Sequence, residues 1–286
     1  MKGILYGIAA YTVWGCLPIY WKQLADINSA TIIAHRIIWG VLTLVPILAF
    51  RQRLTHYFRQ WKDLTVLRNS LITGALLAGN WLIYVWSTLN DRVVEVALGY
   101  YILPLIYVIL GCALLKEKLD AFKAGAVLIA AIGVAIQAIG LGSIPWSALG
   151  VAFSFALYGF IKKKTQSDGL TALTMELSCI APVALAFLMI PSAARGEVAG
   201  DGSSLTIFWL ALTGLATVTP LLFFAAAAKR INLSTLGMLQ FIAPTGQFLT
   251  GWLYYKEPLN NTQLASFGLI WLAITLYSLS SLRRKA

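Results

Sequence analysis

Hydrophobic residues occur along this chain in long runs that are separated by short polar segments. A transmembrane helix needs about 20 consecutive apolar residues, and ten runs have about this length. They predict an all-α integral membrane protein with ten transmembrane helices, at about residues 3–21, 31–50, 69–88, 94–115, 122–141, 147–161, 170–190, 205–228, 234–255 and 263–281. The segments between these runs are too short to contain a water-soluble domain.

The composition supports a membrane protein and excludes an ordinary soluble one. Of the 286 residues, 59% are hydrophobic and only 12% are charged, and the mean hydropathy is +0.77. Globular proteins carry roughly 25% charged residues. A chain with half that fraction cannot cover a water-facing surface, so lipid is expected to be its main surroundings.

The formal net charge of +11 would suggest nucleic-acid binding in a soluble protein. In this chain, however, most basic residues lie in the segments between the apolar runs. If the amino terminus is cytoplasmic, the loops on the opposite face contain only Lys22, Arg92, Arg195 and Lys256 of the 22 lysines and arginines. Short loops rich in Lys and Arg stay on the cytoplasmic side. We therefore expect both termini to be cytoplasmic, with anionic lipid as a partner and no nucleic acid.

One motif occurs twice, which indicates an internal repeat. The pattern Pro-x6-Gly-x4-Lys-Glu-x-Leu spans residues 104–119 and again residues 244–259. Five predicted spans separate the copies, and an odd number reverses the orientation of the second. Inverted repeats of this kind are typical of secondary transporters. The chain is therefore predicted to consist of two five-helix repeats, residues 1–141 and 142–286, that provide alternating access to a central site.

Several segments resemble the RarD-type branch of the EamA family, within the drug/metabolite transporter superfamily. They are Ala34–Trp39, Asn80–Trp86, Gly99–Leu105 and the two Gly-x5-Glu turns that end at Glu117 and Glu257. The resemblance covers essentially the whole chain. It implies a ten-helix inverted repeat in the bacterial inner membrane and the export of small metabolites, such as amino acids, or of amphipathic drugs.

Two prolines at mid-span predict where a substrate site would lie. Pro104 and Pro244 each remove one backbone hydrogen bond and should kink their helices, and the freed carbonyls need polar partners inside the membrane. Glycines in the same spans, Gly99 and Gly237, fit close packing and gating. The helical faces of the prolines present four polar side chains that we expect to line the substrate path: Tyr100, Tyr107, Gln240 and Gln247. Alternatively, these side chains join neighbouring helices.

Other polar and aromatic residues could complete this lining. Asn80 and Tyr84 share one face of the third span. The Asn80 amide must be hydrogen-bonded at that depth, which fits a water-filled path or an interhelical partner equally well. Trp14 and Tyr158 occupy comparable positions in the first helix of each repeat, where they could stack on an apolar substrate.

Arg36 and Glu176 are counterparts in the repeat and lie well inside their spans. Ionisable groups inside a membrane indicate a functional site or a paired charge. We expect an ion pair between them that fastens the two halves. The alternative is that Arg36 binds a substrate carboxylate and Glu176 couples transport to protons.

The sequence contains no residue cluster with metal-ligand spacing and no phosphate-binding glycine motif, so neither a cofactor nor a metal is expected. No catalytic constellation is evident either. The predicted function is a carrier that exports small amphipathic metabolites, amino acids first among them. Drugs such as chloramphenicol or other neutral aromatics are the alternative substrates. A channel or a membrane enzyme are the competing classes, and the apolar faces would allow a homodimer.

Overall fold

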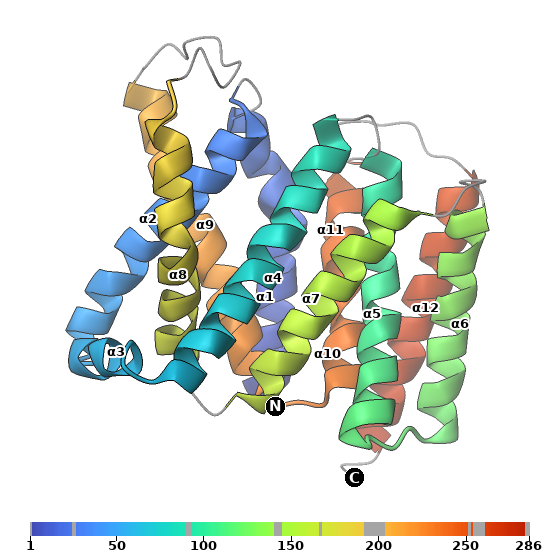
Figure 1. Cartoon of the computed structure of the whole chain (residues 1–286). Helices are drawn as coiled ribbons and strands as arrows, with labels where there is room; N and C mark the ends of the chain where they lie inside the picture. The colour runs from blue at the N-terminus through green and yellow to red at the C-terminus, as the bar shows by residue number, and fades with distance from the viewer. Residues whose placement is uncertain are drawn as a thin grey trace.

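A computed structural model of the chain describes residues 2–24, 27–89, 93–139, 145–165, 168–191, 204–250, 253 and 261–283. These residues form helices and short connections, without a strand among them. The helices are α1 Lys2–Trp21, a 3-10 turn at Lys22–Leu24, α2 Ser29–Phe50, α3 Leu54–Gln60, α4 Leu64–Leu89, α5 Val93–Leu115, α6 Ala121–Ile139, α7 Trp146–Lys164, α8 Gly169–Met189, α9 Ser204–Ala228, α10 Leu233–Gln240, α11 Ile242–Leu249 and α12 Asn261–Arg283. Most stand side by side in one bundle, and the short α3 lies across its end (Figure 1).

The predicted all-α membrane class is confirmed, because the described part has long apolar helices throughout. Six helices are long and apolar enough to cross a bilayer, namely α1, α2, α5, α6, α8 and α9. Helices also occupy the places of the other four predicted spans. Three of these places differ from the six in a simple way. Helix α4 contains polar residues in its first turns, and α7 ends in three lysines, so both are less apolar. A third span is divided into two short helices, α10 and α11. The total of ten spans remains a prediction.

Helices from the two halves of the chain pack against one another throughout the bundle. In the packing, α1 contacts α9 and α11, α7 contacts α4 and α5, and α2 contacts both α8 and α9. Further pairs are α4 with α8, α5 with α10, and α6 with α12. The chain therefore forms one interleaved bundle, and neither half is a separate helical domain.

The two predicted kink sites differ in the structure. Helix α5 continues through Pro104, whereas the helix around Pro244 is interrupted at Phe241, between α10 and α11. Pro244 has no N–H to donate to the carbonyl of Gln240, four residues earlier, which weakens the helix at this point. The helix is therefore interrupted near the second proline expected to kink it, whereas α5 has no interruption at Pro104.

Two of the glycines singled out in the sequence lie at close helix crossings. A Cβ atom on Gly237 of α10 would come within 2.7 Å of the Pro104 carbonyl oxygen of α5, and one on Gly99 of α5 would come within 2.6 Å of the Ala148 carbonyl oxygen of α7. Real Cβ atoms do not approach backbone so closely, so these crossings require glycine.

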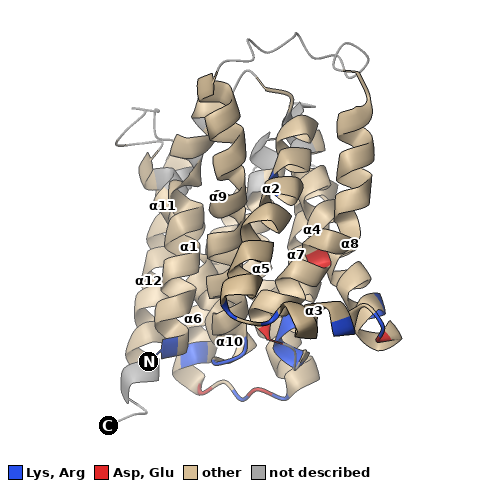
Figure 2. Cartoon of the chain, turned by 90° about the vertical axis from the view of Figure 1, so that its left-hand side faces the viewer, with Lys and Arg blue, Asp and Glu red and all other residues tan. Residues whose placement is uncertain are grey.

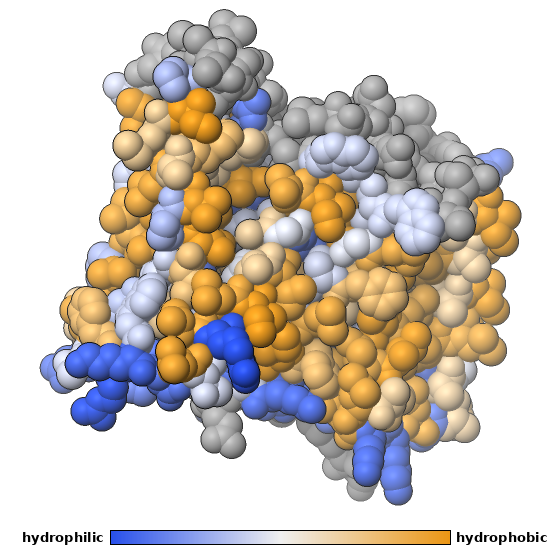
Figure 3. Space-filling model, viewed as in Figure 1, coloured by the Kyte–Doolittle hydropathy of each residue, from blue (hydrophilic) through white to orange (hydrophobic). Residues whose placement is uncertain are grey.

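Charge and hydropathy divide the molecular surface as expected for a membrane protein. Figure 2 shows that the described lysines and arginines gather mostly at the end of the bundle that carries both termini. The flank is largely apolar, and it is hollowed between the side formed by α8 and the side formed by α4 and α7 (Figure 3). Paler, more polar residues show within this hollow.

Candidate functional site

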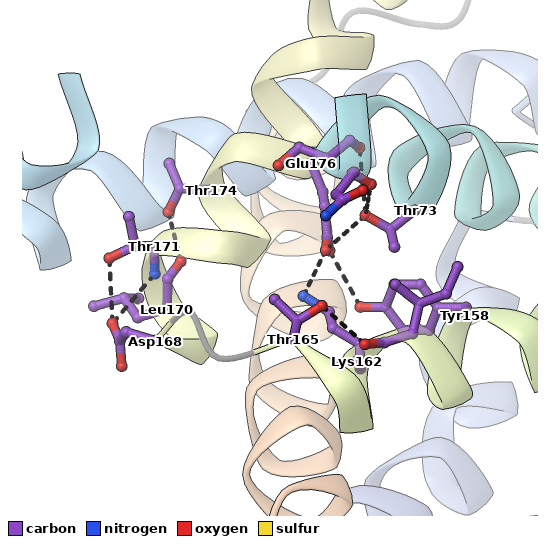
Figure 4. A network of polar contacts seen from close by, with 12 residues as sticks. Thr73, Tyr158, Lys162, Thr165, Asp168, Leu170, Thr171, Thr174 and Glu176 are labelled. Atoms are coloured by element: carbon purple, nitrogen blue, oxygen red, sulfur yellow. Dashed lines mark hydrogen bonds and ion pairs between the residues drawn. The ribbon is translucent and has the colours of Figure 1, made fainter. Parts of the chain in front are cut away.

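A buried ion pair joins α7 to α8. The Lys162 Nζ lies 2.6 Å from the Glu176 Oε1, and the two side chains are each only 3% exposed. Thr73 of α4 donates a hydrogen bond to Oε1 (2.9 Å), and the Tyr158 hydroxyl donates to Oε2 (3.3 Å) (Figure 4). Tyr158 and Lys162 are four residues apart on α7 and therefore share one helical face. The carboxylate of Glu176 on α8 is thus satisfied by partners on two other helices, α4 and α7.

The structure does not pair Arg36 with Glu176, which corrects the expected ion pair. Glu176 is neutralised by Lys162, whose long side chain reaches inward from the last turn of α7. Arg36 lies in α2 and instead donates from Nε to the Thr217 Oγ1 of α9, at 3.0 Å. The two ionisable residues therefore belong to separate sites.

Aromatic side chains enclose the guanidinium of Arg36. Its Cζ lies 4.3 Å from the ring centroid of Trp81 in α4 and 4.9 Å from that of Trp21 at the end of α1. The phenols of Tyr84 and Tyr100 are close enough to interact with it electrostatically. Cation–π contacts favour a guanidinium but do not neutralise its charge. Among the described residues, no Asp or Glu side chain pairs with this cation.

Tyr84 and Tyr100, two of the predicted lining residues, lie together near this cation. Their rings pack edge to face with centroids 6.1 Å apart, and Tyr84 is 40% exposed. The contacts of Arg36 connect α2 with α1, α4 and α9. This group of residues is called the arginine site below.

Three other predicted lining residues pack into a closed aromatic core around Phe224 of α9. Ring centroids lie between 5.3 and 6.5 Å from that of Phe224, and the rings belong to Tyr11, Trp14, Tyr107, Phe155 and Tyr158. The Tyr107 hydroxyl donates to the carbonyl of Phe155 at 3.1 Å, which joins α5 to α7. In this conformation Tyr107 and Tyr158 are fully buried and serve as helix contacts, the alternative that the sequence left open for Tyr107.

Asn80 also joins helices in this conformation. Its amide donates to the carbonyl of Val151 at 2.8 Å and to the Ser154 hydroxyl at 3.0 Å, both on α7. The residue is 2% exposed. Of the two roles that the sequence allowed, the structure therefore favours the interhelical one.

We expect Asn80→Ala to destabilise the protein by about 1 kcal/mol, a typical value for a hydrogen bond between membrane helices. Uptake of substrate should stay within about twofold of the unmodified chain, because the Asn80 amide is engaged by Val151 and Ser154 of α7. Unfolding in mixed detergent would measure the first effect and proteoliposome transport the second. Ser154→Ala is the milder matched variant, because it leaves the bond to Val151 intact. A large loss of transport with unchanged stability would contradict this structural role.

The two predicted glutamines are described to different extents. Gln240 is the last residue of α10 and is 3% exposed, and its Oε1 has no hydrogen-bond partner among the described residues. It precedes the interruption at Phe241. The side chain of Gln247 lies outside the described residues, as does the second Lys-Glu corner at Lys256 and Glu257.

Comparison with known proteins identifies the family. A model of the EamA-like transporter family matches residues 1–138 and, a second time, residues 143–279. The chain belongs to the EamA-like transporter family. It is therefore a multi-pass membrane transporter of this type and not an enzyme, and the resemblance recognised in the sequence is confirmed.

Curated relatives cover almost the whole chain. It is 39% identical over 290 residues to the uncharacterized transporter YojE of Bacillus subtilis, covering 99% of this chain and 96% of that one. It is 34% identical over 289 residues to protein RarD of Escherichia coli (98% and 95% covered). The chloramphenicol-sensitive protein RarD of Pseudomonas aeruginosa is 27% identical over 288 residues (99% and 95% covered).

A solved crystal structure shares the fold of the chain. It matches with a TM-score of 0.74 and 17% sequence identity, covering 97% of both chains. This likeness supports the helical arrangement and gives no information about the substrate.

Sequence reasoning missed the main partners of both charged residues. Lys162 was assigned to a cytoplasmic loop, although its spacing from Tyr158 places both on one face of α7. Trp21 ends the first predicted span, and Trp81 lies in the Asn80–Trp86 segment that carries the family resemblance. Adjacency to Asn80 gave no signal for Trp81, because consecutive residues of a helix project about 100° apart.

Proposed function

We propose that the protein is a secondary transporter built from two inverted five-helix repeats, residues 1–141 and 142–286, that work by alternating access. The packing supports this arrangement. If α1, α2, α4, α5 and α6 are exchanged for α7, α8, α9, α10–α11 and α12, every helix pair named above becomes either another pair in the same set or, for α2–α8, α5–α10 and α6–α12, the same pair again. The contact of α1 with α9, for example, becomes that of α7 with α4. Inverted repeats place substrate sites between the halves.

Equivalent glycines also support the repeat. Gly74 of α4 packs against the carbonyl of Glu176 in α8, and Gly214 of α9 packs against the carbonyl of Trp39 in α2. These glycines are 140 residues apart in the sequence, as are Arg36 and Glu176. The family model also matches the chain twice, with a boundary near residue 140. This similarity between the α4–α8 crossing and the α9–α2 crossing supports the proposed repeat.

We propose amino acids as the first class of substrate, and the arginine site carries this assignment. A guanidinium between two tryptophans, without a carboxylate partner among the described residues, suits the carboxylate of a ligand. The rings of Tyr84 and Tyr100 offer an apolar wall with hydroxyl groups for the rest of the molecule. A small zwitterion with an apolar side chain fits this chemistry.

A neutral aromatic drug is the second candidate. The name of the Pseudomonas relative refers to chloramphenicol sensitivity, and the tryptophan and tyrosine faces could stack on such a ring. This ligand would supply no counter-ion to Arg36, which has no carboxylate partner among the residues that the structure describes. For that reason the carboxylate-bearing class ranks first.

The charge distribution supports the proposed topology. The basic end that carries both termini would face the cytoplasm of a bacterium, in the inner membrane. The arginine site lies toward the start of α2 and the end of α1, which is the opposite half of the bundle. In this conformation the site would therefore be directed to the outside, as after the release of an exported substrate.

Counterflow in proteoliposomes tests the proposal. Vesicles with purified protein are loaded with one unlabelled amino acid or with chloramphenicol, and uptake of a labelled compound is followed. Saturable uptake that is stimulated by an internal amino acid would support the carrier and its substrate class. Stimulation by chloramphenicol alone would favour the drug class. Flux without saturation would indicate a channel, and chemical conversion of the label would indicate an enzyme, so either would overturn the proposal.

A further inference from the structure

The end of α5 has a conformation that turns the chain sharply back. Lys116 adopts a left-handed backbone conformation (φ 55°), which is uncommon for a residue with a side chain. The N–H of Glu117 donates to the carbonyl of Gly111 at 3.0 Å, which closes the last turn of the helix. This corner directs the Glu117 side chain back across α5.

The Glu117 carboxylate caps a different helix. Its Oε1 accepts a hydrogen bond from the backbone N–H of Leu233 at 2.6 Å, and its Oε2 accepts from the N–H of Ser234 at 3.0 Å and from the Ser234 hydroxyl at 2.7 Å. Leu233 and Ser234 are the first residues of α10, whose N-cap Asn232 makes no side-chain capping bond. A negative charge at a helix N-terminus is favoured by the free N–H groups and by the helix dipole.

Gly111 makes room for this contact. A Cβ atom at Gly111 would lie 2.6 Å from the Glu117 Oε2 and 3.3 Å from the Ser234 nitrogen. The glycine, the left-handed lysine and the glutamate of the Gly-x4-Lys-Glu motif therefore act together. In the first copy, the motif positions a carboxylate that holds the start of α10.

Helix α10 runs from this cap, at the basic end of the bundle, to the crossing with α5 at mid-bundle. Helices α5 and α10 pack against each other where Gly237 meets Pro104, one turn before Gln240. The Glu117 corner follows α5 at the end that carries both termini (Figure 1). Lys163 of α7 reinforces the same place, because its Nζ donates to the carbonyl of Ile231 at 2.5 Å, just before α10.

We propose that Glu117 is a positioning residue for transport, whose carboxylate holds α10 against α5 and keeps the basic end of the bundle closed. Release of this cap is then required before the substrate path opens at that end. The inference rests on the proposed alternating access. It adds a role for the Lys-Glu corner at the end of α5. This corner holds the start of α10, the helix that leads to the interruption at Phe241, and the contact is called the latch below.

Paired cysteine reporters test the latch in nanodiscs, where both faces are accessible to reagent. Cys16, Cys112 and Cys179 are first replaced by serine. One reporter, Leu236→Cys, lies fully buried in α10 just beyond the cap, and the other, Tyr84→Cys, lies at the exposed edge of the arginine site. In Glu117→Ala we expect maleimide labelling of Leu236→Cys to rise about tenfold, the effect of losing a strong helix cap, and labelling of Tyr84→Cys to fall.

Matched variants separate a latch from general loosening. Glu257→Ala removes the same residue from the second copy of the motif and should not raise labelling of Leu236→Cys. Gly111→Ala keeps the carboxylate but displaces it, so it should raise that labelling even if Glu117→Ala folds poorly. Unchanged labelling in these variants, or a parallel rise at both reporters, would overturn the proposal. The assay needs no substrate, so a failure of counterflow would not be confused with a failure of the latch.

Discussion

Lys162→Met is expected to destabilise the protein by about 3–5 kcal/mol, because removal of one partner leaves a buried charge uncompensated. The carboxylate of Glu176 is 3% exposed, and Thr73 and Tyr158 alone would then have to stabilise it. Thermal or detergent unfolding of the purified protein would measure the loss. It should appear whether or not substrate is present.

The double variant Lys162→Met/Glu176→Gln provides the control. The glutamine retains an oxygen that can accept from Thr73 and Tyr158, and no unpaired charge remains. We expect most of the lost stability to return, since neutral replacements for a buried ion pair are often tolerated. A double variant as unstable as the single one would show that the ion pair does not account for the effect.

Arg36→Gln should reduce the transport efficiency for carboxylate substrates by roughly 100-fold, because loss of one partner of a buried charge pair removes about 2–5 kcal/mol of binding. Arg36→Lys should rescue little, since an ammonium cannot match a planar guanidinium that stacks between Trp21 and Trp81. Initial rates of uptake over a range of substrate concentrations would measure both effects.

Two matched variants sharpen this test. Arg59→Gln removes an exposed arginine from α3 and should leave uptake unchanged. Glu95→Gln removes the acidic residue near the start of α5 and should also preserve uptake if the counter-ion of Arg36 is the substrate itself. Unimpaired uptake of amino acids by Arg36→Gln would exclude Arg36 from the substrate site. A loss of chloramphenicol transport alone would shift the assignment to the neutral aromatic class.

The fold class could be predicted from the sequence because each apolar run is a local feature. A helix in lipid must satisfy its own backbone, so length and hydropathy determine where it forms. The interruption near Pro244 was predictable for the same reason. The short helix α3 was not predicted, because it lies in a charged segment outside the spans.

The partners of the charged residues could not be predicted, because they depend on how the helices pack. The repeat proposed from the sequence makes Arg36 and Glu176 equivalent positions, but equivalence does not imply contact. Glu176 of α8 pairs with Lys162 of α7, the preceding helix in the chain, and not with Arg36. Likewise, Tyr100 and Tyr107 share the helical face of Pro104, so the sequence predicted the same role for both. In the structure, Tyr100 lies near Arg36 and Tyr107 lies in the aromatic core around Phe224.

For the proposed alternating-access carrier, the unequal helices at the two copies of the motif have a kinetic consequence. Helix α5 is continuous through Pro104, and its proposed counterpart is divided at Phe241, so we expect the two helices to bend differently. Such asymmetry cannot decide the direction of net flux, which the concentration gradients alone determine. It would allow the half-saturating concentration to differ between the two sides of the bilayer, so that the proposed carrier serves one compartment better than the other.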